Sequence, residues 1–538
     1  MLNRLIVELL NKLRARKSPA AAYQRALEHF QKGRDGEARE ICTQLLAADP
    51  GFAAALDLLG AIAGRTEDLD EMEQIVRRIL ALQPLEPGVH FRLGVILRAK
   101  GLCHEAIACF RQAIALDPAH EEARSALPSC MMFAHGIAPG EIFAETLRYA
   151  EQFDAATARA KAPTHPNTAD PLRRLRVGYV AFDFGNQTNH YYLRPLFAAH
   201  DRTQYEIFLY DNSSRETGAT RALKFPGDTW RCIAGLSHEQ AAARIREDEI
   251  DILVDVSGHL MDNRLRTFAR KPAPVQMTWL SYPQTTGIGA IDFRITDRYC
   301  DPPGVADSYY VEKLLRLPDS YWCYAPPFDL PPGPLPALSN GFVTFGSFNI
   351  FIKLTPPTLD LWAKLLGQVV NSRLMMLCVP SAESERRVRA VFERAGIAGD
   401  RLIVHRRLAE NRYWRSFQQV DIALDPFPCT GATTTLDTLW MGVPVVSLAG
   451  DSCPSRAGVS ILNTAGRPEW IAGDAARYLD IARELAADLP RLDAIRRELH
   501  HGIPQSPLAD GQRFARNMES LYRGAWKDWC EARAAQPL

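Results

Sequence analysis

Residues 175–182 read LRVGYVAF, and DFGN follows at 183–186. A short apolar run followed by a segment of helical length is typical of a buried strand in a parallel sheet. Four similar runs follow along the chain: EIFLYDN (206–212), DILVDVSG (251–258), VQMTWLSYP (275–283) and FRITD (293–297). The sequence therefore predicts a parallel α/β lobe, which we place at residues 171–330.

A proline-rich segment at 326–341 separates this lobe from a second series of apolar runs. These are FVTFGSFN (342–349), RLMMLCVP (373–380), RLIVHRR (401–407), DIALDPFP (421–428) and VPVVSLAG (443–450). Two such lobes enclose a cleft, and their functional loops follow the carboxyl ends of the strands. We expect the second lobe at 340–465 and C-terminal helices at 466–538 that pack back over both lobes. The expected functional loops are 183–190, 257–264, 348–353 and 426–437.

The first third of the chain repeats with a fixed period. Pro50, Pro84 and Pro118 are 34 residues apart, and Gly60 and Gly94 share that spacing. This period is that of the tetratricopeptide repeat, in which small residues let two antiparallel helices approach and a proline ends the second. We predict an α-helical repeat array at residues 19–155 whose surface grips protein or peptide partners. Such arrays often self-associate, so a homo-oligomer is compatible with the pattern.

Bulk composition narrows the class of protein. The 63 basic and 63 acidic residues cancel, which gives no electrostatic case for nucleic acid or an anionic membrane. Eleven cysteines without a CxxC pair fit free thiols in a reducing compartment. Residues 1–18 are predicted to form an amphipathic helix, and no apolar run is long enough to span a membrane. We therefore expect a cytoplasmic protein without stable membrane insertion.

The strand-end loops resemble those of the O-linked N-acetylglucosamine transferases and the related SPINDLY proteins, in their bacterial type. The matching stretches cover about residues 172–525: LRVGYVAFDFGN, DILVDVSGH, RKPAPVQMTWLSYPQTTG, DFRITD, EKLLRLPDSYWCY, VTFGSFNIFIKLTP, DIALDPFP and TTTLDTLWMGVPVV. Many dispersed motifs in one order are more specific than a single glycine loop. The resemblance implies a GT-B fold of two Rossmann-like lobes, with a nucleotide sugar bound in the C-terminal lobe and inverting transfer to protein side chains.

Cleavage of a sugar–diphosphate bond requires positive charge near the departing phosphates. Metal-dependent transferases commonly use an Asp-x-Asp at a strand end, but Asp68-Leu69-Asp70 lies in the repeats and is interpreted as a solvated helix face. A metal-free enzyme needs cations and oriented N–H groups instead. Lys353, after FGSFN, matches the phosphate-binding lysine of the similar family; the alternative is a surface lysine at a helix start. No metal site is predicted.

The segment 433–437 carries the other predicted donor contacts. Thr433, Thr434 and Thr435 precede a helical stretch, where hydroxyls and free N–H groups form an anion site or simply cap the helix. The resemblance implies that these threonines contact the diphosphate and that Asp437 is the carboxylate that binds the ribose hydroxyls. Tyr413 matches a ring that lies against the base, although a core tyrosine fits the sequence equally well.

Two histidines are candidate bases, because each follows an expected strand. His190 lies in the first loop, and His259 resembles a histidine of the bacterial members; either can instead be structural. The family's histidine directly after DFGN is Gln187 here, which occupies a catalytic position but cannot act as a base. The sequence departs from the family pattern again around the expected sugar pocket, at Gln284, Ile350, Thr430 and Ala432.

The leading hypothesis is a protein O-glycosyltransferase that moves a sugar to Ser or Thr of client proteins held by the repeats. UDP-GlcNAc is the default donor by resemblance, with GDP-fucose, UDP-glucose or an Asn acceptor as variants, and no cofactor is expected. The alternative from another class is a non-catalytic adaptor with a degenerate transferase fold. Gln187, Gln284 and Ile350 favour the adaptor, whereas Lys353 and Asp437 argue against it.

Overall fold

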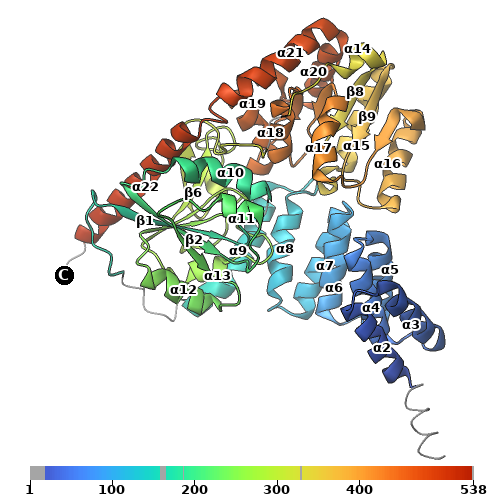
Figure 1. The fold of residues 1–538 in the computed structure, drawn as a ribbon, viewed down its shortest axis with the longest axis horizontal. Coiled ribbons are helices and arrows are strands. Elements are labelled where there is room, and N and C mark those ends of the chain that lie inside the picture. Colours follow the sequence, from blue (N-terminus) through green and yellow to red (C-terminus); the bar gives the residue numbers. More distant parts are fainter. Residues whose placement is uncertain (1–17, 158–164, 186, 328–329, 536–538) are drawn as a thin grey trace, which may run out of the picture. The chain divides into compact units, whose positions relative to one another are not determined.

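The computed structural model of this chain describes residues 18–157, 165–185, 187–327 and 330–535 (Figure 1). The helix predicted at residues 1–18 lies outside these ranges except for its last residue. Two compact units divide the chain: Met1–Arg124 with Pro380–Arg387, and Ser125–Val379 with Val388–Leu538. Within the described ranges, no helix is both long enough and apolar enough to cross a bilayer. All eleven cysteines are free thiols.

Most of the first unit is built from helices of 13 or 14 residues: α2 (Pro19–Gln31), α3 (Asp35–Ala48), α4 (Ala53–Arg65), α5 (Leu69–Leu82), α6 (Pro87–Ala99) and α7 (Cys103–Leu116). They pack in pairs, α2 with α3, α4 with α5 and α6 with α7. Pro50, Pro84 and Pro118 each lie two residues past the second helix of a pair, where a missing N–H costs no helical bond. The predicted tetratricopeptide-repeat array is confirmed.

Close packing inside the last pair explains its glycine. A Cβ atom added to Gly94 would lie 2.6 Å from the Phe110 ring, which is fully buried. At the equivalent place one repeat earlier, a Cβ on Gly60 would lie 3.7 Å from Ile75, an ordinary contact. Packing therefore requires glycine at position 94, whereas position 60, one period earlier, has room for a Cβ atom.

The interpretation of Asp68-Leu69-Asp70 as a solvated helix face holds for Asp68, which is exposed, but not for Asp70. Asp68 caps α5 by accepting the N–H of Glu71 at 3.1 Å. Asp70 forms an ion pair with Lys100 at 2.9 Å, and Lys100 is fully buried. Burying the long side chain of Lys100 requires a paired anion, a tertiary constraint that the local sequence does not show.

The second unit contains two parallel sheets. The strands of the first are β1 (Leu175–Ala181), β2 (Tyr205–Asp211), β3 (Thr229–Cys232), β4 (Ile252–Asp255), β5 (Val275–Thr278), β6 (Phe293–Asp297) and β7 (Lys313–Leu317). Their spatial order is β3-β2-β1-β4-β5-β6-β7, and every residue of β4 and β5 is buried. Helices cover this sheet: α10 (Gln187–Ala199), α11 (Gly218–Ala222), α12 (His238–Glu247) and α13 (Leu265–Ala269) (Figure 1).

The second sheet has the strands β8 (Val343–Ser347), β9 (Ser372–Met376), β10 (Leu402–Val404), β11 (Ile422–Leu424), β12 (Val445–Leu448) and β13 (Ile471–Ala472). Their order is β10-β9-β8-β11-β12-β13, which is the doubly wound arrangement. Its helices are α14 (Pro336–Asn340), α15 (Pro356–Gln368), α16 (Ala382–Arg394), α17 (Glu410–Ser416), α18 (Thr433–Trp440) and α19 (Ala457–Thr464). The prediction of two Rossmann-like lobes is confirmed.

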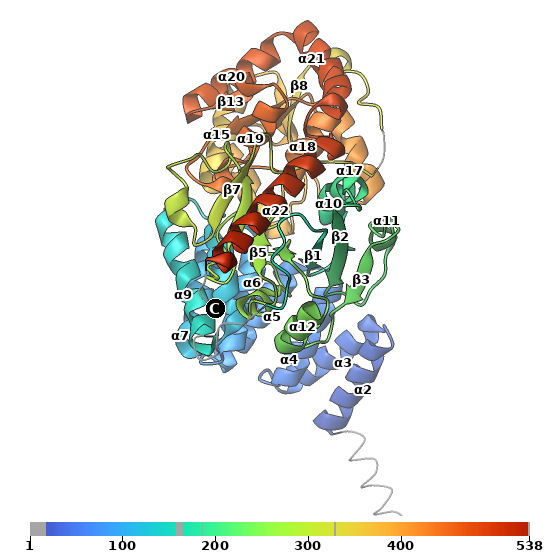
Figure 2. The same ribbon diagram turned by 90° about the vertical axis from the view of Figure 1, so that its left-hand side faces the viewer.

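The C-terminal helices cover both lobes, as predicted. α20 (Ala475–Ala487) and α21 (Leu489–Gly502) lie on the second lobe, where α20 contacts β12. The long helix α22 (Gly511–Ala534) returns to the first lobe and packs along α10 (Figure 2). Its Glu519 accepts a hydrogen bond from the backbone N–H of Asp201 at 2.9 Å. The tail therefore contacts both lobes.

Two helices that we assigned to the repeat region contact the first lobe. The boundary between the compact units falls after Arg124, within α8 (Glu121–Met131), so α9 (Pro139–Thr157) belongs to the second unit. Tyr149 of α9 lies edge-on to the ring of His259, with centroids 4.7 Å apart. Helical periodicity continues across this boundary, which is why the sequence does not reveal it.

The two repeat glycines are expected to respond oppositely to alanine. Gly60→Ala should stabilise its helix pair by up to about 1 kcal/mol, because alanine favours helix and has room. Gly94→Ala gains the same propensity but overpacks Phe110, at a cost of about 1–3 kcal/mol, so its net effect should be destabilising. Hydrogen exchange in α4–α5 and α6–α7 measures both effects, and equal shifts of one sign would contradict this packing argument.

Candidate functional site

The predicted functional loops follow the strands that flank the switch points of the two sheets. Strand order reverses between β1 and β4 in the first sheet and between β8 and β11 in the second. The loops 183–190 and 257–264 follow β1 and β4, and the loops 348–353 and 426–437 follow β8 and β11. Ligands of doubly wound sheets bind at this point, beyond the carboxyl ends of the strands.

Lys353 ends the turn that follows β8, and its side chain is half-buried. Its Nζ donates a hydrogen bond to the carbonyl oxygen of Thr430 at 2.6 Å, which joins the loops after β8 and β11. An ammonium has three donors, and this bond uses one. Burial raises the pKa of the nearby Asp425 carboxyl to about 6, and the charge of Lys353 opposes that rise. A cation is therefore held at the switch point of the second sheet.

Helix α18 begins beside this lysine without a capping side chain. Its N-cap residue is Ala432, which makes no side-chain bond to the first turn. The threonines instead contact other loops: Thr434 donates to Asn349 Oδ1 at 2.9 Å, and Thr433 accepts from the Tyr192 hydroxyl at 2.7 Å. Of the two sequence interpretations, plain capping by these threonines does not occur. The uncapped N–H groups and the positive end of the helix dipole form a site suited to an anion.

The loop before α18 is tightly constrained at one glycine. The N–H of Gly431 donates to Asp425 Oδ1 at 3.1 Å, and Thr435 Oγ1 donates to the same oxygen at 3.2 Å. A Cβ atom on Gly431 would lie 2.4 Å from Thr435 Oγ1 and 2.7 Å from Thr434 Oγ1. Only glycine lets the backbone reach the start of the helix in this way.

Asp437 lies one turn further along α18 and is 3% exposed. One of its carboxylate oxygens accepts the Tyr324 hydroxyl, and the other accepts the Tyr413 hydroxyl at 2.6 Å. Burial raises the pKa of Asp437 to about 7, and the two phenol donors oppose that rise. Tyr413 packs edge-on to Phe348, so both of its sequence interpretations remain open: it is a packed ring, and it borders the anion site.

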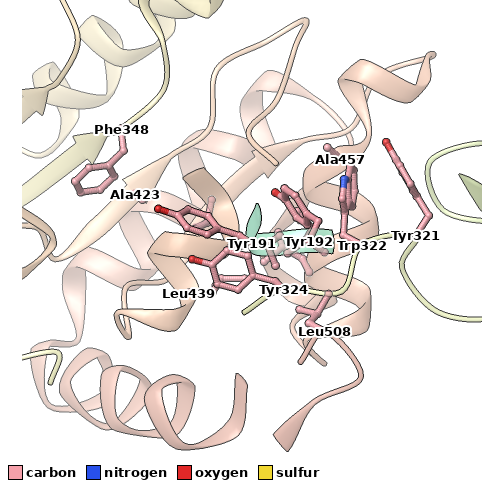
Figure 3. Packing of buried hydrophobic residues seen from close by; sticks show 14 of the residues in the cluster. Tyr191, Tyr192, Tyr321, Trp322, Tyr324, Phe348, Ala423, Leu439, Ala457 and Leu508 are labelled. Atoms are coloured by element: carbon pink, nitrogen blue, oxygen red, sulfur yellow. The ribbon is translucent and has the colours of Figure 1, made fainter. Parts of the chain in front are cut away.

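Aromatic side chains of both lobes meet around this carboxylate. Tyr191 and Tyr192 of α10 approach Tyr324, which lies on the connection between the lobes (Figure 3). Their ring centroids lie 6.0 and 6.1 Å from that of Tyr324, in edge-on geometry. The anion site is therefore built from both lobes.

The two candidate histidines have different environments. His190, in α10, is partly exposed, but its Nε2 atom is buried and has no hydrogen-bond partner among the described residues. Burial and then the charge of Arg194 lower its pKa, which keeps the ring neutral. His259 is 3% exposed, its Nε2 bonds the Thr286 carbonyl oxygen at 2.9 Å, and burial lowers its pKa to about 4. Its other nitrogen faces the Ser125 hydroxyl at 3.3 Å.

His190 thus has a free nitrogen, whereas His259 is satisfied within the core. Gln187, the remaining predicted catalytic residue, is the first residue of α10, and its side chain lies outside the described part of the structure.

The positions that depart from the family pattern have varied surroundings. Ile350 is 53% exposed, whereas Gln284 and Thr430 are buried. The backbone oxygen of Gln284 accepts from the buried guanidinium of Arg294 at 3.1 Å. Ile350 is thus the departure with the greatest freedom to meet a ligand.

Several residues of the site were not predicted from the sequence. Asp425 ends the DIALD run at a strand end, a position that could have identified it. Tyr192, Tyr324 and Asn349 act through contacts between distant segments, which the sequence does not show. Among the described residues, no group of three His, Cys, Asp or Glu side chains is arranged to hold a metal ion.

Comparisons with known proteins agree with this geometry. A model of glycosyl transferase family 41 matches residues 156–325 and 336–518, and a tetratricopeptide-repeat model matches residues 87–120. An O-GlcNAc transferase of Thermobaculum terrenum, solved as a lysine-to-methionine mutant, superposes with a TM-score of 0.86 at 35% identity. The alignment covers 96% of this chain and 98% of that one, so the GT-B prediction is confirmed.

Curated relatives match over part of their length. The chain is 39% identical over 373 residues to the probable UDP-N-acetylglucosamine–peptide N-acetylglucosaminyltransferase SPINDLY of Petunia hybrida, covering 68% of this chain and 40% of that protein. It is 30% identical over 433 residues to the corresponding probable transferase SEC of Arabidopsis thaliana, covering 77% and 44%. The chain spans about two fifths of the length of these relatives.

Gly431→Ala is expected to weaken anion binding, because the new methyl group forces apart Thr434, Thr435 and Asp425. We expect pyrophosphate affinity to fall at least about tenfold, equivalent to about 1.4 kcal/mol. Gly367→Ala is the matched control, since a Cβ there meets nothing within 4 Å. Calorimetric titration with pyrophosphate measures both variants, and equal affinities would show that this loop does not form the site.

Proposed function

We propose a function from one premise: the chain belongs to glycosyl transferase family 41. It transfers a sugar from a nucleotide sugar, by default N-acetylglucosamine from UDP-GlcNAc, to Ser or Thr of proteins held by its repeats. The observation that carries this proposal is the uncapped start of α18 beside Lys353, an anion site at the switch point. The names of the relatives supply the donor, and the shared repeat architecture supports a protein acceptor.

The departing diphosphate is the group that this site stabilises. As the sugar–oxygen bond breaks, negative charge grows on the phosphate, next to the Lys353 ammonium and the N–H groups of α18. Thr433 accepts from Tyr192, which leaves its own hydroxyl hydrogen to donate to a phosphate oxygen. Fixed donors of this kind commonly contribute about 3–4 kcal/mol each to transition-state stabilisation. These residues supply the charge that a metal ion supplies in other transferases.

His190 is the proposed base. Burial lowers the pKa of its ring, and its Nε2 is unbonded among the described residues, so the ring can take the proton from an acceptor hydroxyl that reaches this nitrogen as the hydroxyl oxygen attacks the anomeric carbon. Attack opposite the departing diphosphate inverts the anomeric centre. Gln187 precedes His190 in the same helix, and its amide is suited to orient a substrate but not to remove a proton.

Donor and acceptor identity are the finer parts of the proposal. Ile350 places an exposed apolar side chain beside the lysine loop. An apolar side chain cannot hydrogen-bond a sugar hydroxyl, so this position favours a ligand that presents no hydroxyl group to it. GDP-fucose, UDP-glucose and an Asn acceptor are the variants to compare with UDP-GlcNAc and Ser or Thr. Eleven free cysteines fit a cytoplasmic location, where nucleotide sugars and reduced thiols coexist.

Lys353→Ala is expected to remove nucleotide binding and transfer together. At about 100 times its dissociation constant, a nucleotide should stabilise the wild type by about 2.7 kcal/mol in a thermal-shift screen of UDP, GDP and their sugars. The variant should lose most of that shift and its transfer of labelled sugar to protein. Lys364→Ala, an exposed lysine on α15, is the matched control. EDTA should leave wild-type transfer unchanged.

Two results of this screen would overturn the proposal. Nucleotide binding without transfer from any sugar nucleotide would identify an adaptor with a degenerate transferase fold. If none of the nucleotides binds, the proposed donor site is wrong.

Nucleotide affinity is expected to rise with pH through Asp437. Its pKa is about 7, so the carboxyl is mostly protonated at pH 6 and mostly ionised at pH 8. If the anion accepts the ribose hydroxyls, affinity should increase about tenfold across this interval. Calorimetric titrations of the wild type and Asp437→Asn at both pH values separate this effect from ionisation of the phosphate. Equal pH dependence in both proteins would exclude Asp437 as the source.

A further inference from the structure

Each oxygen of the Asp437 carboxylate accepts a hydrogen bond from the protein itself. Tyr324 donates to Oδ1 and Tyr413 donates to Oδ2, from two segments of the chain that are far apart in sequence. Two neutral hydroxyl donors on one buried carboxylate reproduce the hydrogen bonding of a vicinal diol. The site is therefore complementary to a diol, and in the free protein side chains take the place of that diol.

The two tyrosines are held to different degrees. Tyr324 is 1% exposed, and its backbone N–H donates to the Leu508 carbonyl oxygen at 2.7 Å. Its ring is enclosed by Tyr191 and Tyr192, as Figure 3 shows, and by Trp440. Tyr324 is thus fixed by backbone and ring contacts.

Tyr413 is only partly buried and lies on the seven-residue helix α17. Its ring makes edge contacts with Phe348, Trp414 and Phe417 on its own lobe. Within the described part of the chain, its hydroxyl bonds Asp437 alone. Both tyrosines thus pack among aromatic rings, and the difference between them is burial: Tyr413 is the donor nearer to solvent, so we take it as the one that can leave.

We propose that the Tyr413 hydroxyl is a placeholder that the nucleotide ribose displaces from Asp437, while Tyr324 stays and orients the carboxylate. This inference rests on the proposed function, because it takes the ligand to be a ribonucleoside diphosphate. Asp437 lies one helical turn after Thr433, so a ribose attached to a diphosphate at the start of α18 falls near it. Tyr413 is a specificity-determining residue in this scheme, and Tyr324 is a positioning residue.

The exchange explains why a buried carboxylate persists without a ligand. An unpaired anion in this position would be strongly disfavoured, and the phenol satisfies it until the ribose arrives. Breaking the Tyr413 bond offsets part of the gain from the ribose bonds, which moderates affinity for the correct nucleotide. A dideoxyribose has no hydroxyl to exchange, so it leaves Tyr413 in place.

The test compares a nucleoside diphosphate with its 2′,3′-dideoxy form by calorimetric titration, using UDP and GDP in turn. In Tyr413→Phe the carboxylate loses its placeholder, so affinity for the ribonucleotide should rise about tenfold while that for the dideoxy form stays unchanged. In Tyr324→Phe the ribonucleotide affinity should not rise. Tyr210→Phe is the matched control, because Tyr210 donates to the Asp248 carboxylate at 2.8 Å in the first lobe, away from the cleft. It should bind like the wild type.

The outcomes separate the inference from the proposed function. The placeholder proposal is wrong if Tyr413→Phe lowers the affinity for the ribonucleotide or leaves it unchanged. It is also wrong if the variant raises the affinities for the ribonucleotide and the dideoxy form equally. If the wild type binds neither UDP nor GDP, the proposed function fails first. Binding that depends on Lys353, without a selective gain in Tyr413→Phe, leaves the transferase proposal intact and rejects this inference alone.

Discussion

A buried carboxylate at the end of β11 organises the candidate anion site. Asp425 is 1% exposed, and it accepts from the Gly431 N–H at 3.1 Å and from Ser447 Oγ at 3.0 Å. A buried charge must be hydrogen-bonded, so the loop between β11 and α18 folds around it. This requirement fixes where α18 begins, brings its N–H groups next to Lys353, and leaves room only for glycine at position 431.

Helix α10 of the first lobe contributes further residues to the candidate site. Helix α10 carries both Tyr192, which bonds Thr433, and His190, which has a free nitrogen. One rigid helix therefore sets the position of the candidate base relative to the anion site. Further bonds between the lobes reinforce it, such as that from Ser460 to Asp297 at 2.7 Å. In this arrangement one helix links the proposed base to the proposed leaving-group site.

Features that depend on burial or repetition could be predicted from the sequence. Strands buried on both faces, such as β4 and β5, are apolar runs, and the 34-residue period marks the repeats. Strands β3, β7 and β13 went unpredicted; each lies at a sheet edge and is only partly buried. The pairing of Asp70 with Lys100 and of Asp437 with Tyr324 joins segments distant in sequence, so no local pattern predicts it.

The two histidines show what residue type and strand-end position leave undecided. Both follow a strand beside the switch point of the first sheet, and both were equal candidates on that ground. His259 is enclosed by the rings of Tyr149 and Tyr282 and uses both nitrogens within the protein. His190 keeps one nitrogen unbonded at the start of α10. Hydrogen-bond satisfaction therefore distinguishes the two rings where residue type and position do not, because the His190 Nε2, unlike either nitrogen of His259, is left without a partner among the described residues.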